Sequence, residues 1–390
     1  MSNWKEYKLG DLVTFQRGHD LPREQMQEGI YPVAGSNSII GFHNKYTSDC
    51  PGITIGRSGN IGNPQLHKTK FWAHNTTLYV KEFKGVDPVF FYYLLNILDF
   101  SQLNSGSAVP SLNRNFIHPF KVKIPSSVQT QTAIAEILSS LDDKIELNNK
   151  INQELENLAQ TLFKQWFIDF EFPNENGDPY KSSGGEMVES ELGMIPKGWT
   201  VEVIKNRVKN IKTSPKSEVP IFNRKYVPID KMAIKSLVIN NYSPSEDAKS
   251  SLILFEKGDI LLGAMRVYFH RVNYCPFDGV TRTTCFVLRP YQKSELSFFL
   301  LYLNQSETIE YANRTSKGTT MPYAVWEDGL AELKFVCPIS EITSLFNLSI
   351  TELLNLISEN IKENLELTNL RNFILPKLIS GELEINENNN

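Results

Sequence analysis

Two stretches of the chain have the spacing of apolar residues that is typical of long amphipathic helices. In the first, apolar side chains recur at steps of mostly three and four residues, at Leu138, Leu141, Ile145, Ile151, Leu155, Leu158 and Leu162. This spacing predicts a helix of about 40 residues, roughly 60 Å long at 1.5 Å per residue. A second stretch, near residues 341–380, predicts a similar helix. Each is too long for a lone surface helix, and helices in proteins are stabilised mainly by packing of their apolar face, so we expect the two to pack against each other.

The second half of the chain repeats the first. At an offset of 212, six of these apolar positions, all except Ile151, fall on apolar residues, namely Ile350, Leu353, Ile357, Leu367, Leu370 and Ile374. The segments before the two helices also correspond, with Trp4 matching Trp199, residues 53–56 matching 260–263, 90–96 matching 298–304, and 105–110 matching 316–322. The chain is therefore organised as module, helix, module, helix.

This organisation predicts an α+β protein with two pseudo-repeated α/β modules, joined by two long antiparallel helices in a coiled-coil-like spacer. Within the first module, Asp87 and Pro88 predict a helix start, with Asp as the cap. The expected segments are a first module, a central helix, a linker rich in Gly, Ser and Glu, a second module, and a C-terminal helix with its tail, over residues 1–125, 126–172, 173–195, 196–338 and 339–390.

The helix pair should be held together by apolar side chains with a few amides among them. The expected interface residues are Leu141, Ile145, Asn148, Leu155, Leu162, Leu353, Ile357, Asn360, Leu367 and Ile374. Asn148 and Asn152 in the first helix match Asn360 and Asn364 in the second. They are either solvated, or they face each other at the crossing point and define the register. If they face each other, replacing Asn148 and Asn360 together by Leu should raise the thermal stability.

The net charge of −4 conceals an alternation along the chain. Residues 1–125 have 13 basic and 9 acidic side chains, a net charge of +4, and residues 196–338 have 20 and 14, a net charge of +6. The helical and linker segments are acidic. Positive charge on the modules favours a nucleic-acid partner, whereas the acidic helices suit a protein partner.

Several classes of chemistry are not supported by motifs. The chain contains no convincing phosphate-binding loop, zinc-protease motif or nucleophile elbow. Residues 87–90 (DPVF) are close to an adenine-methyltransferase motif, but helix capping explains them without catalysis. The four cysteines are scattered and predict free buried thiols, and the six histidines have no metal-ligand spacing. We expect no catalytic residue and no metal site, and, without a signal-peptide pattern or long apolar run, a cytoplasmic protein.

Polar, Gly-containing loops at matching places in both modules are candidate contacts to nucleic acid. Arg can bind guanine edges, Asn and Gln bind adenine, and Lys, Ser and Thr bind mostly phosphates. The candidates are Arg17, Arg57, Ser58, Asn60, Ser105, Ser107, Asn113, Arg114, Lys212, Lys216, Arg266, Tyr268, His270, Arg271, Lys317, Thr319, Thr320 and Tyr323.

Three segments carry a resemblance to a known family. Residues 141–167 (LDDKIELNNKINQELENLAQTLFKQWF), 193–199 (GMIPKGW) and 375–383 (LPKLISGEL), together with the repeated layout, resemble specificity subunits of type I restriction–modification systems. The resemblance implies that each module is a target-recognition domain for one half of a split, asymmetric site in double-stranded DNA. It also implies that the helices are a ruler and a docking surface for two modification subunits, with restriction subunits joining them.

The same resemblance implies that this chain has no cofactor of its own. S-adenosylmethionine, ATP and Mg would be bound by the partner subunits, which carry out adenine methylation and cleavage. Other interpretations are a non-catalytic scaffold, an RNA-binding protein built from a tandem repeat, and an autonomous methyltransferase or nuclease. The charge pattern disfavours the scaffold and the missing motifs disfavour the enzyme, while only the resemblance separates DNA from RNA.

Overall fold

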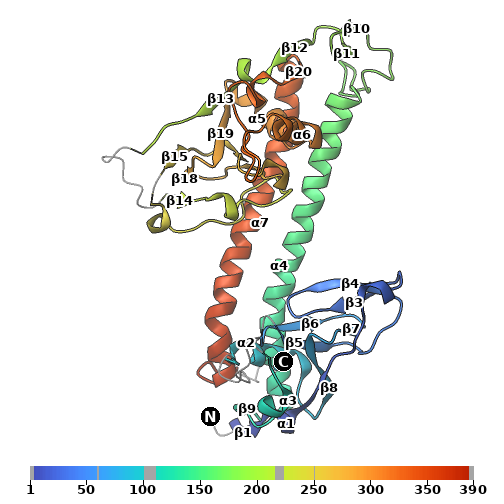
Figure 1. Cartoon of the computed structure of the whole chain (residues 1–390), viewed down its shortest axis with the longest axis vertical. Helices are drawn as coiled ribbons and strands as arrows, with labels where there is room; N and C mark the ends of the chain where they lie inside the picture. Colours follow the sequence, from blue (N-terminus) through green and yellow to red (C-terminus); the bar gives the residue numbers. More distant parts are fainter. Residues whose placement is uncertain (1–3, 59–60, 101–110, 216–223, 250, 386–390) are drawn as a thin grey trace. The chain divides into compact units, whose positions relative to one another are not determined.

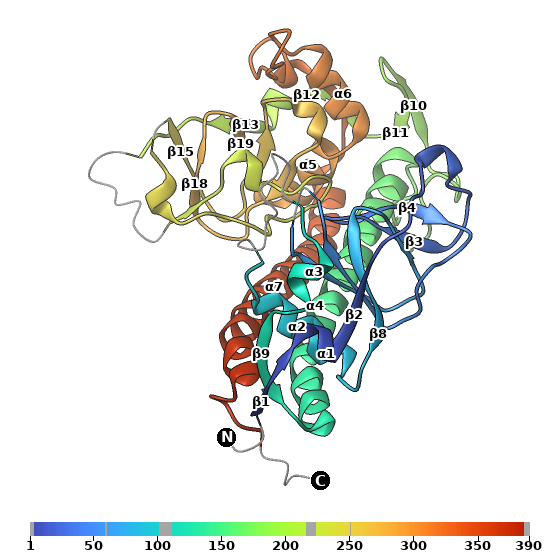
Figure 2. The same ribbon diagram turned by 60° about the horizontal axis from the view of Figure 1, so that its bottom comes forward.

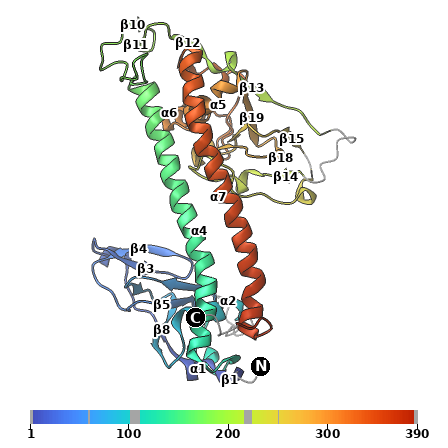
Figure 3. The same ribbon diagram turned by 180° about the vertical axis from the view of Figure 1, so that it is seen from behind.

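The computed structural model describes residues 4–58, 61–100, 111–215, 224–249 and 251–385, and they form a mixture of helices and strands as expected (Figure 1). The chain divides into two compact units. Unit 1 contains residues 1–146 and 364–390, and unit 2 contains residues 147–363. Two long helices, α4 (Val128–Phe163) and α7 (Ser340–Ser380), contribute residues to both units (Figure 3).

Unit 1 has three sheets among its described residues (Figure 2). The largest has the order β2-β8-β5-β6, formed by Val13–Arg17, Thr77–Phe83, Gly52–Gly56 and Pro64–His67. The second has the order β4-β3-β7, formed by Ile39–His43, Tyr31–Ala34 and Trp72–Ala73, and the third pairs β1 (Trp4–Lys8) with β9 (Lys121–Pro125). The short helices are α1 (Leu9–Leu12), the 3-10 helix Arg23–Gln25, α2 (Pro88–Ile97) and α3 (Arg114–Ile117).

The core of unit 1 lies between the large sheet, α2, and the two long helices. The fully buried Phe15, Phe90 and Phe91 belong to one cluster that also contains Leu138 of α4 and Leu378 of α7. Helix α2 begins as predicted, because the Asp87 carboxylate accepts a hydrogen bond of 2.8 Å from the Phe90 N–H. The end of α7 is also joined to the N-terminal strand, since the Trp4 Nε1 donates to the Ile379 carbonyl at 3.0 Å.

Unit 2 has four sheets among its described residues. They have the orders β13-β19-β16-β17 (Val208–Ile211, Cys285–Pro290, Ile260–Gly263 and Val272–Tyr274), β14-β18-β15 (Lys225–Tyr226, Gly279–Arg282 and Leu252–Phe255), β12-β20 (Thr200–Val203 and Lys334–Cys337) and β10-β11 (Met187–Ser190 and Gly193–Pro196). Its shorter helices are α5 (Leu296–Leu303) and α6 (Ser306–Arg314), the π-helix Lys164–Ile168, and the 3-10 helices Ile204–Asn206, Ile229–Lys231, Ser245–Asp247, Val267–Phe269, Lys293–Glu295 and Leu330–Glu332.

The two units repeat one strand topology. In unit 1 the strand order is β2-β8-β5-β6, and the strands at the corresponding places of unit 2 have the order β13-β19-β16-β17. The smaller sheets share one parallel pair, β3 with β7 in unit 1 and β14 with β18 in unit 2, but the third strand pairs with β3 in unit 1 and with β18 in unit 2. In both units one further antiparallel pair includes the strand that precedes a long helix, β1 with β9 before α4 and β12 with β20 before α7. The sequence repeat is therefore also a repeat of strand pairing.

Helices α4 and α7 run antiparallel within unit 2. Asn148 Nδ2 donates to Glu363 Oε2 at 2.7 Å, and Asn360 Nδ2 donates to Asn152 Oδ1 at 2.8 Å. Of the expected amide contacts, the structure has the one between Asn152 and Asn360. Asn148 is fully buried and is hydrogen-bonded to Glu363 rather than to Asn360. Asn148 and Asn152 lie one helical turn apart on α4, so their amides bond to different residues of α7.

The other expected interface residues lie at different depths. Ile357 is buried, while Leu155, Leu162 and Leu353 are partly buried against the core of unit 2 and Ile374 against that of unit 1. Leu141, Ile145 and Leu367 are half-buried. Three members of the apolar pattern, Ile151, Leu158 and Leu370, are instead 37%, 46% and 47% exposed. When two helices pack together, each buries only one stripe of its surface. Apolar residues outside that stripe therefore stay exposed.

The segment expected to be a linker is ordered around a hairpin. Strands β10 and β11 pair from Met187–Pro196 to Ser190–Gly193, and Ile195 belongs to the core of unit 2. Among the described residues, no helix has the length and apolar character needed to cross a membrane.

Candidate nucleic-acid interface

Strand pairing brings two of the predicted arginines together in unit 1. Strands β2 and β5 lie on opposite sides of β8 and are both antiparallel to it, so both end beside the start of β8. Arg17, the last residue of β2, pairs with Leu78, and Gly56, the last residue of β5, pairs with Thr77. Arg57 follows directly. Two side chains 40 positions apart in the sequence therefore lie at the same edge of one sheet.

A third segment is held beside Arg57 by backbone hydrogen bonds. Ser58 and Ser111 form a β-bridge, and the Leu112 N–H donates to the Arg57 carbonyl at 2.8 Å. This contact positions the start of α3, where the Asn113 side chain accepts a hydrogen bond of 3.0 Å from the Asn115 N–H. Arg114 is the first residue of that helix and is exposed.

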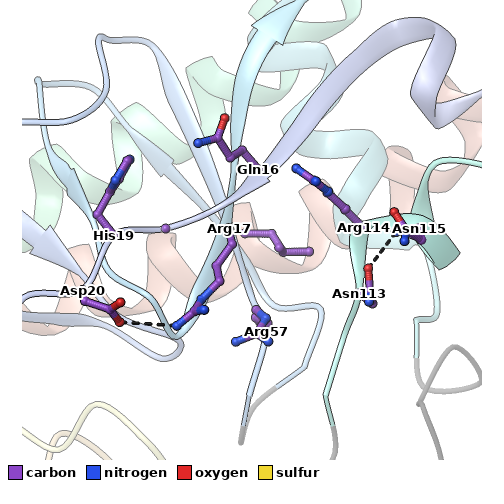
Figure 4. A pocket seen from close by; sticks show the side chains of 10 residues that line it. Gln16, Arg17, His19, Asp20, Arg57, Asn113, Arg114 and Asn115 are labelled. Atoms are coloured by element: carbon purple, nitrogen blue, oxygen red, sulfur yellow. Dashed lines mark hydrogen bonds and ion pairs between the residues drawn. The ribbon is translucent and has the colours of Figure 1, made fainter.

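These segments enclose a pocket of about 740 Å³ with a largely polar lining (Figure 4). It is lined by Gln16, Arg17, Gly18, His19, Asp20, Arg57, Leu78, Asn113, Arg114 and Asn115. The structure thus brings together four predicted residues, Arg17, Arg57, Asn113 and Arg114. With three arginines and one carboxylate, the pocket suits an anionic ligand that also presents hydrogen-bond acceptors.

Two residues that the sequence did not single out connect the arginines. The Asp20 carboxylate lies 3.3 Å from Arg17 Nη2 and also accepts a hydrogen bond from Asn75 Nδ2. Together, first the Asn75 bond and then the charge of Arg17 hold the pKa of Asp20 below its usual value. The Asn75 carbonyl in turn accepts a 3.5 Å hydrogen bond from Arg57 Nη1. Asp20 follows the predicted Arg17 loop, but nothing in the sequence pattern pointed to Asn75.

In unit 2, the equivalent loops meet through an equivalent bridge. Met265 and Tyr323 form a β-bridge, which matches the Ser58–Ser111 bridge of unit 1 in its place after the corresponding strand. The Arg266 N–H donates to the Pro322 carbonyl at 2.8 Å, and Lys317 and Tyr323 exchange two backbone hydrogen bonds of 2.9 and 2.8 Å. Arg266 therefore lies beside residues 317–323, in agreement with the loop correspondence predicted from the sequence.

The side chains on these unit 2 loops differ in their accessibility. Tyr268 is 50% exposed, and Lys317, Thr319 and Thr320 are exposed. Arg271 is half-buried and lies 4.9 Å from the centre of the Phe269 ring. These positions suit contacts with a ligand outside the loops.

His270 does not have the surface position expected of a DNA contact. It is buried, and its Nε2 donates a 2.8 Å hydrogen bond to the Asn304 carbonyl. Its role is to anchor the turn Val267–Phe269, on whose two sides Arg266 and His270 have positive φ angles of 51° and 57°. A histidine in a cationic loop has the same sequence pattern whether it faces a ligand or the core, so the sequence did not indicate this burial.

The remaining candidates have varied positions. Tyr323 is half-buried, with its hydroxyl donating to the Thr283 carbonyl, and Lys212 forms an exposed ion pair of 3.8 Å with Glu327. Asn60, Ser105, Ser107 and Lys216 lie outside the described residues.

No group of acidic, His or Cys side chains in the described part of the chain has the arrangement of a metal site. All four cysteines are free thiols, but only Cys275, Cys285 and Cys337 are buried as expected. Cys50 is exposed, which the sequence did not indicate.

Comparison with known proteins gives one family. Residues 1–157 match the family described as type I restriction modification DNA specificity domain. The MjaIX specificity subunit of Methanocaldococcus jannaschii is 28% identical, over 78% of this chain and 71% of that protein. The HindI specificity subunit of Haemophilus influenzae is 23% identical, over 98% of this chain and 100% of that protein.

A solved structure shows the same fold. The crystal structure of a type I restriction–modification S subunit from M. genitalium has a TM-score of 0.63 and 16% identity, over 98% of this chain and 97% of that one. The resemblance predicted from the sequence is confirmed, because residues 1–157 match this family and both relatives are type I restriction enzyme specificity subunits.

Proposed function

We propose that this chain reads the sequence of double-stranded DNA for a type I restriction–modification complex, one part of a split site with each unit. The observation that carries the proposal is the pocket in which Arg17, Arg57 and Arg114 meet. Arginine is suited both to guanine edges in the major groove and to backbone phosphates. The net charge of +4 over residues 1–125 and +6 over residues 196–338 supplies the long-range attraction that a polyanion requires.

The two parts of the site should differ in sequence. At corresponding places unit 1 has Arg57 and Ser58, whereas unit 2 has Ala264 and Met265. Different side chains on a shared backbone arrangement read different bases. The target is therefore asymmetric, unlike the palindromic target of a symmetric dimer.

The long helices would serve as the docking surface for two modification subunits. Exposed apolar side chains follow them, including Leu147, Leu158, Leu365, Leu370 and Phe373, which are 45–62% exposed. Large apolar side chains left exposed along a helix favour contact with a protein partner. The modification subunits would bind S-adenosylmethionine and methylate adenine, and restriction subunits would supply ATP- and Mg-dependent translocation and cleavage, so this chain takes no catalytic part.

The test is long-read modification sequencing of DNA from a host that expresses this chain with its modification subunits. Three strains are compared, with the wild-type chain, with the chain deleted, and with Arg17, Arg57 and Arg114 replaced together by Ala. We expect a split, asymmetric motif with N6-methyladenine that is lost on deletion and is lost or relaxed on one side in the variant. An unchanged methylation pattern after deletion, with the modification subunits present, would refute the proposal in favour of a scaffold or RNA-binding role.

A further inference from the structure

The three arginines of the pocket do not have the same surroundings. Arg17 lies beside a carboxylate, with its Nη2 at 3.3 Å from Asp20 Oδ1. The same oxygen accepts the hydrogen bond from Asn75 Nδ2. Figure 4 shows Asp20 on one side of Arg17 and Arg114 on the other. Asp20 is thus restrained from two sides, and it restrains one edge of the Arg17 guanidinium.

Arg57 and Arg114 have no such partner in the described part of the chain. Among the described residues, the Arg57 guanidinium donates only to the Asn75 carbonyl, at the long distance of 3.5 Å. The Arg114 side chain forms no hydrogen bond or ion pair with another described residue. Both guanidinium groups therefore keep their full positive charge and nearly all their donors for a ligand.

The presence or absence of a carboxylate beside an arginine favours different ligand atoms. A phosphate approaching Arg17 would also approach the negative charge of Asp20, and like charges at short range repel each other. The O6 and N7 atoms of guanine are uncharged acceptors that a planar guanidinium can bind in pairs. A carboxylate that holds one edge of the guanidinium leaves its other donors oriented for such a pair. Arginines without a carboxylate partner suit phosphates better.

We propose that Arg17 reads a guanine in the part of the target recognised by unit 1, with Asp20 and Asn75 as its positioning residues, and that Arg57 and Arg114 contact phosphates. This inference rests on the proposed function. It divides the pocket into one base-reading arginine and two backbone-binding arginines. Asn75 contacts both kinds of arginine environment, because its side chain donates a hydrogen bond to Asp20 and its carbonyl accepts one from Arg57.

The experiment measures equilibrium DNA binding by the complex of the full chain with its modification subunits. The probes are the duplex with the mapped target, a set of duplexes in which each base pair of the unit 1 half is replaced in turn, and an unrelated duplex. Each is titrated at several salt concentrations. The variants are Arg17→Ala, Asp20→Asn and Asn75→Ala, with Arg57→Ala and Arg114→Ala as matched arginine controls. Arg17 and Asp20 are 54% and 71% exposed, so these replacements should leave the fold intact, and thermal unfolding checks this.

For Arg17→Ala we expect discrimination at one guanine position to fall by about 10- to 100-fold, with little change in the dependence of affinity on salt. The Arg57 and Arg114 controls should weaken all duplexes alike and lower the slope of log K against log salt by about 1. Asp20→Asn should reduce the same guanine preference while strengthening the binding of unrelated duplexes, because it removes the charge that repels phosphate. Asn75→Ala should reduce the guanine preference without this gain.

Different results would contradict this inference and the proposed function. If Arg17→Ala lowers the salt slope and leaves base discrimination unchanged, Arg17 is a phosphate contact and the inference is wrong. The same conclusion follows if the affected position is not a guanine, or if the unit 1 half of the target contains none. A wild-type complex that binds all duplexes equally would instead overturn the proposed function.

Discussion

At the scale of single residues, the buried histidines of this protein show how a polar side chain serves the fold. His67 is 6% exposed, its ring stacks on Phe71 with centroids 4.1 Å apart, and its Nε2 shares a 2.9 Å hydrogen bond with Thr54 Oγ1. Burial lowers the pKa of His67 to about 4. The imidazole is therefore neutral in the folded unit near pH 7.

This burial predicts a loss of stability in mild acid. The unfolded chain binds a proton at His67 near pH 6.5 and the folded chain only near pH 4. The contribution to stability is therefore complete above pH 6.5 and is lost as the pH falls from 6.5 to 4, by up to about 3 kcal/mol. Denaturant unfolding of the wild type and of His67→Gln between pH 7 and 4.5 measures this loss of stability. The variant should show a shallower decline, and equal slopes for both proteins would contradict the prediction.

At the scale of elements, the amides between α4 and α7 are the features that distinguish this helix pair from a purely apolar one. Asn152 and Asn360 share a 2.8 Å hydrogen bond, and neither is fully buried. A polar pair inside an apolar seam defines register at some cost in stability. Because Asn148 is bonded to Glu363, the pair to replace is Asn152 with Asn360 rather than Asn148 with Asn360.

Replacing Asn152 and Asn360 together by Leu should raise the stability of the chain, by about 1–2 kcal/mol, since two apolar side chains then meet where a single hydrogen bond was. Either single replacement removes the partner of the remaining amide and should lower stability by about 1 kcal/mol. Denaturant unfolding of the four proteins gives both values as a double-mutant cycle. A double variant less stable than wild type would show that the amides stabilise the pair.

At the scale of the whole molecule, the proposed ruler can be tested by changing helix length. Adding seven residues, about two turns, to α4 and to the paired region of α7 keeps the same faces in contact and lengthens the pair by about 10 Å. If the helices set the spacing, modification sequencing should show an unspecified spacer longer by about three base pairs. The control adds seven residues after Gly184, an exposed position outside the helices with open space around it. An unchanged spacer in the helix variant would refute the ruler.

The features that could be predicted from the sequence are those set by neighbouring residues or by the repeat. The 3.6-residue period of α4 and α7, the Asp87 cap and the correspondence between the loops after residues 56 and 263 all depend on local spacing or on comparing one half with the other. Such patterns can be recognised in the sequence without knowledge of the tertiary contacts. They persist because an apolar stripe or a helix cap requires particular residue types at fixed separations.

The composition of the site depended on tertiary structure. Arg17, Arg57 and Arg114 lie around one pocket only because β2 and β5 both flank β8 and a bridge holds residue 111 beside residue 58. Tertiary contacts also bring Asn75 beside Asp20 and Arg57, and they bury His270 in unit 2 against the Asn304 carbonyl. Sheet pairing joins residues that are far apart in sequence, and whether a polar side chain faces a ligand or a carbonyl is decided by those distant partners. The sequence alone determined the long helices, the repeat and the resemblance to specificity subunits, and the tertiary structure decided which side chains form the pocket.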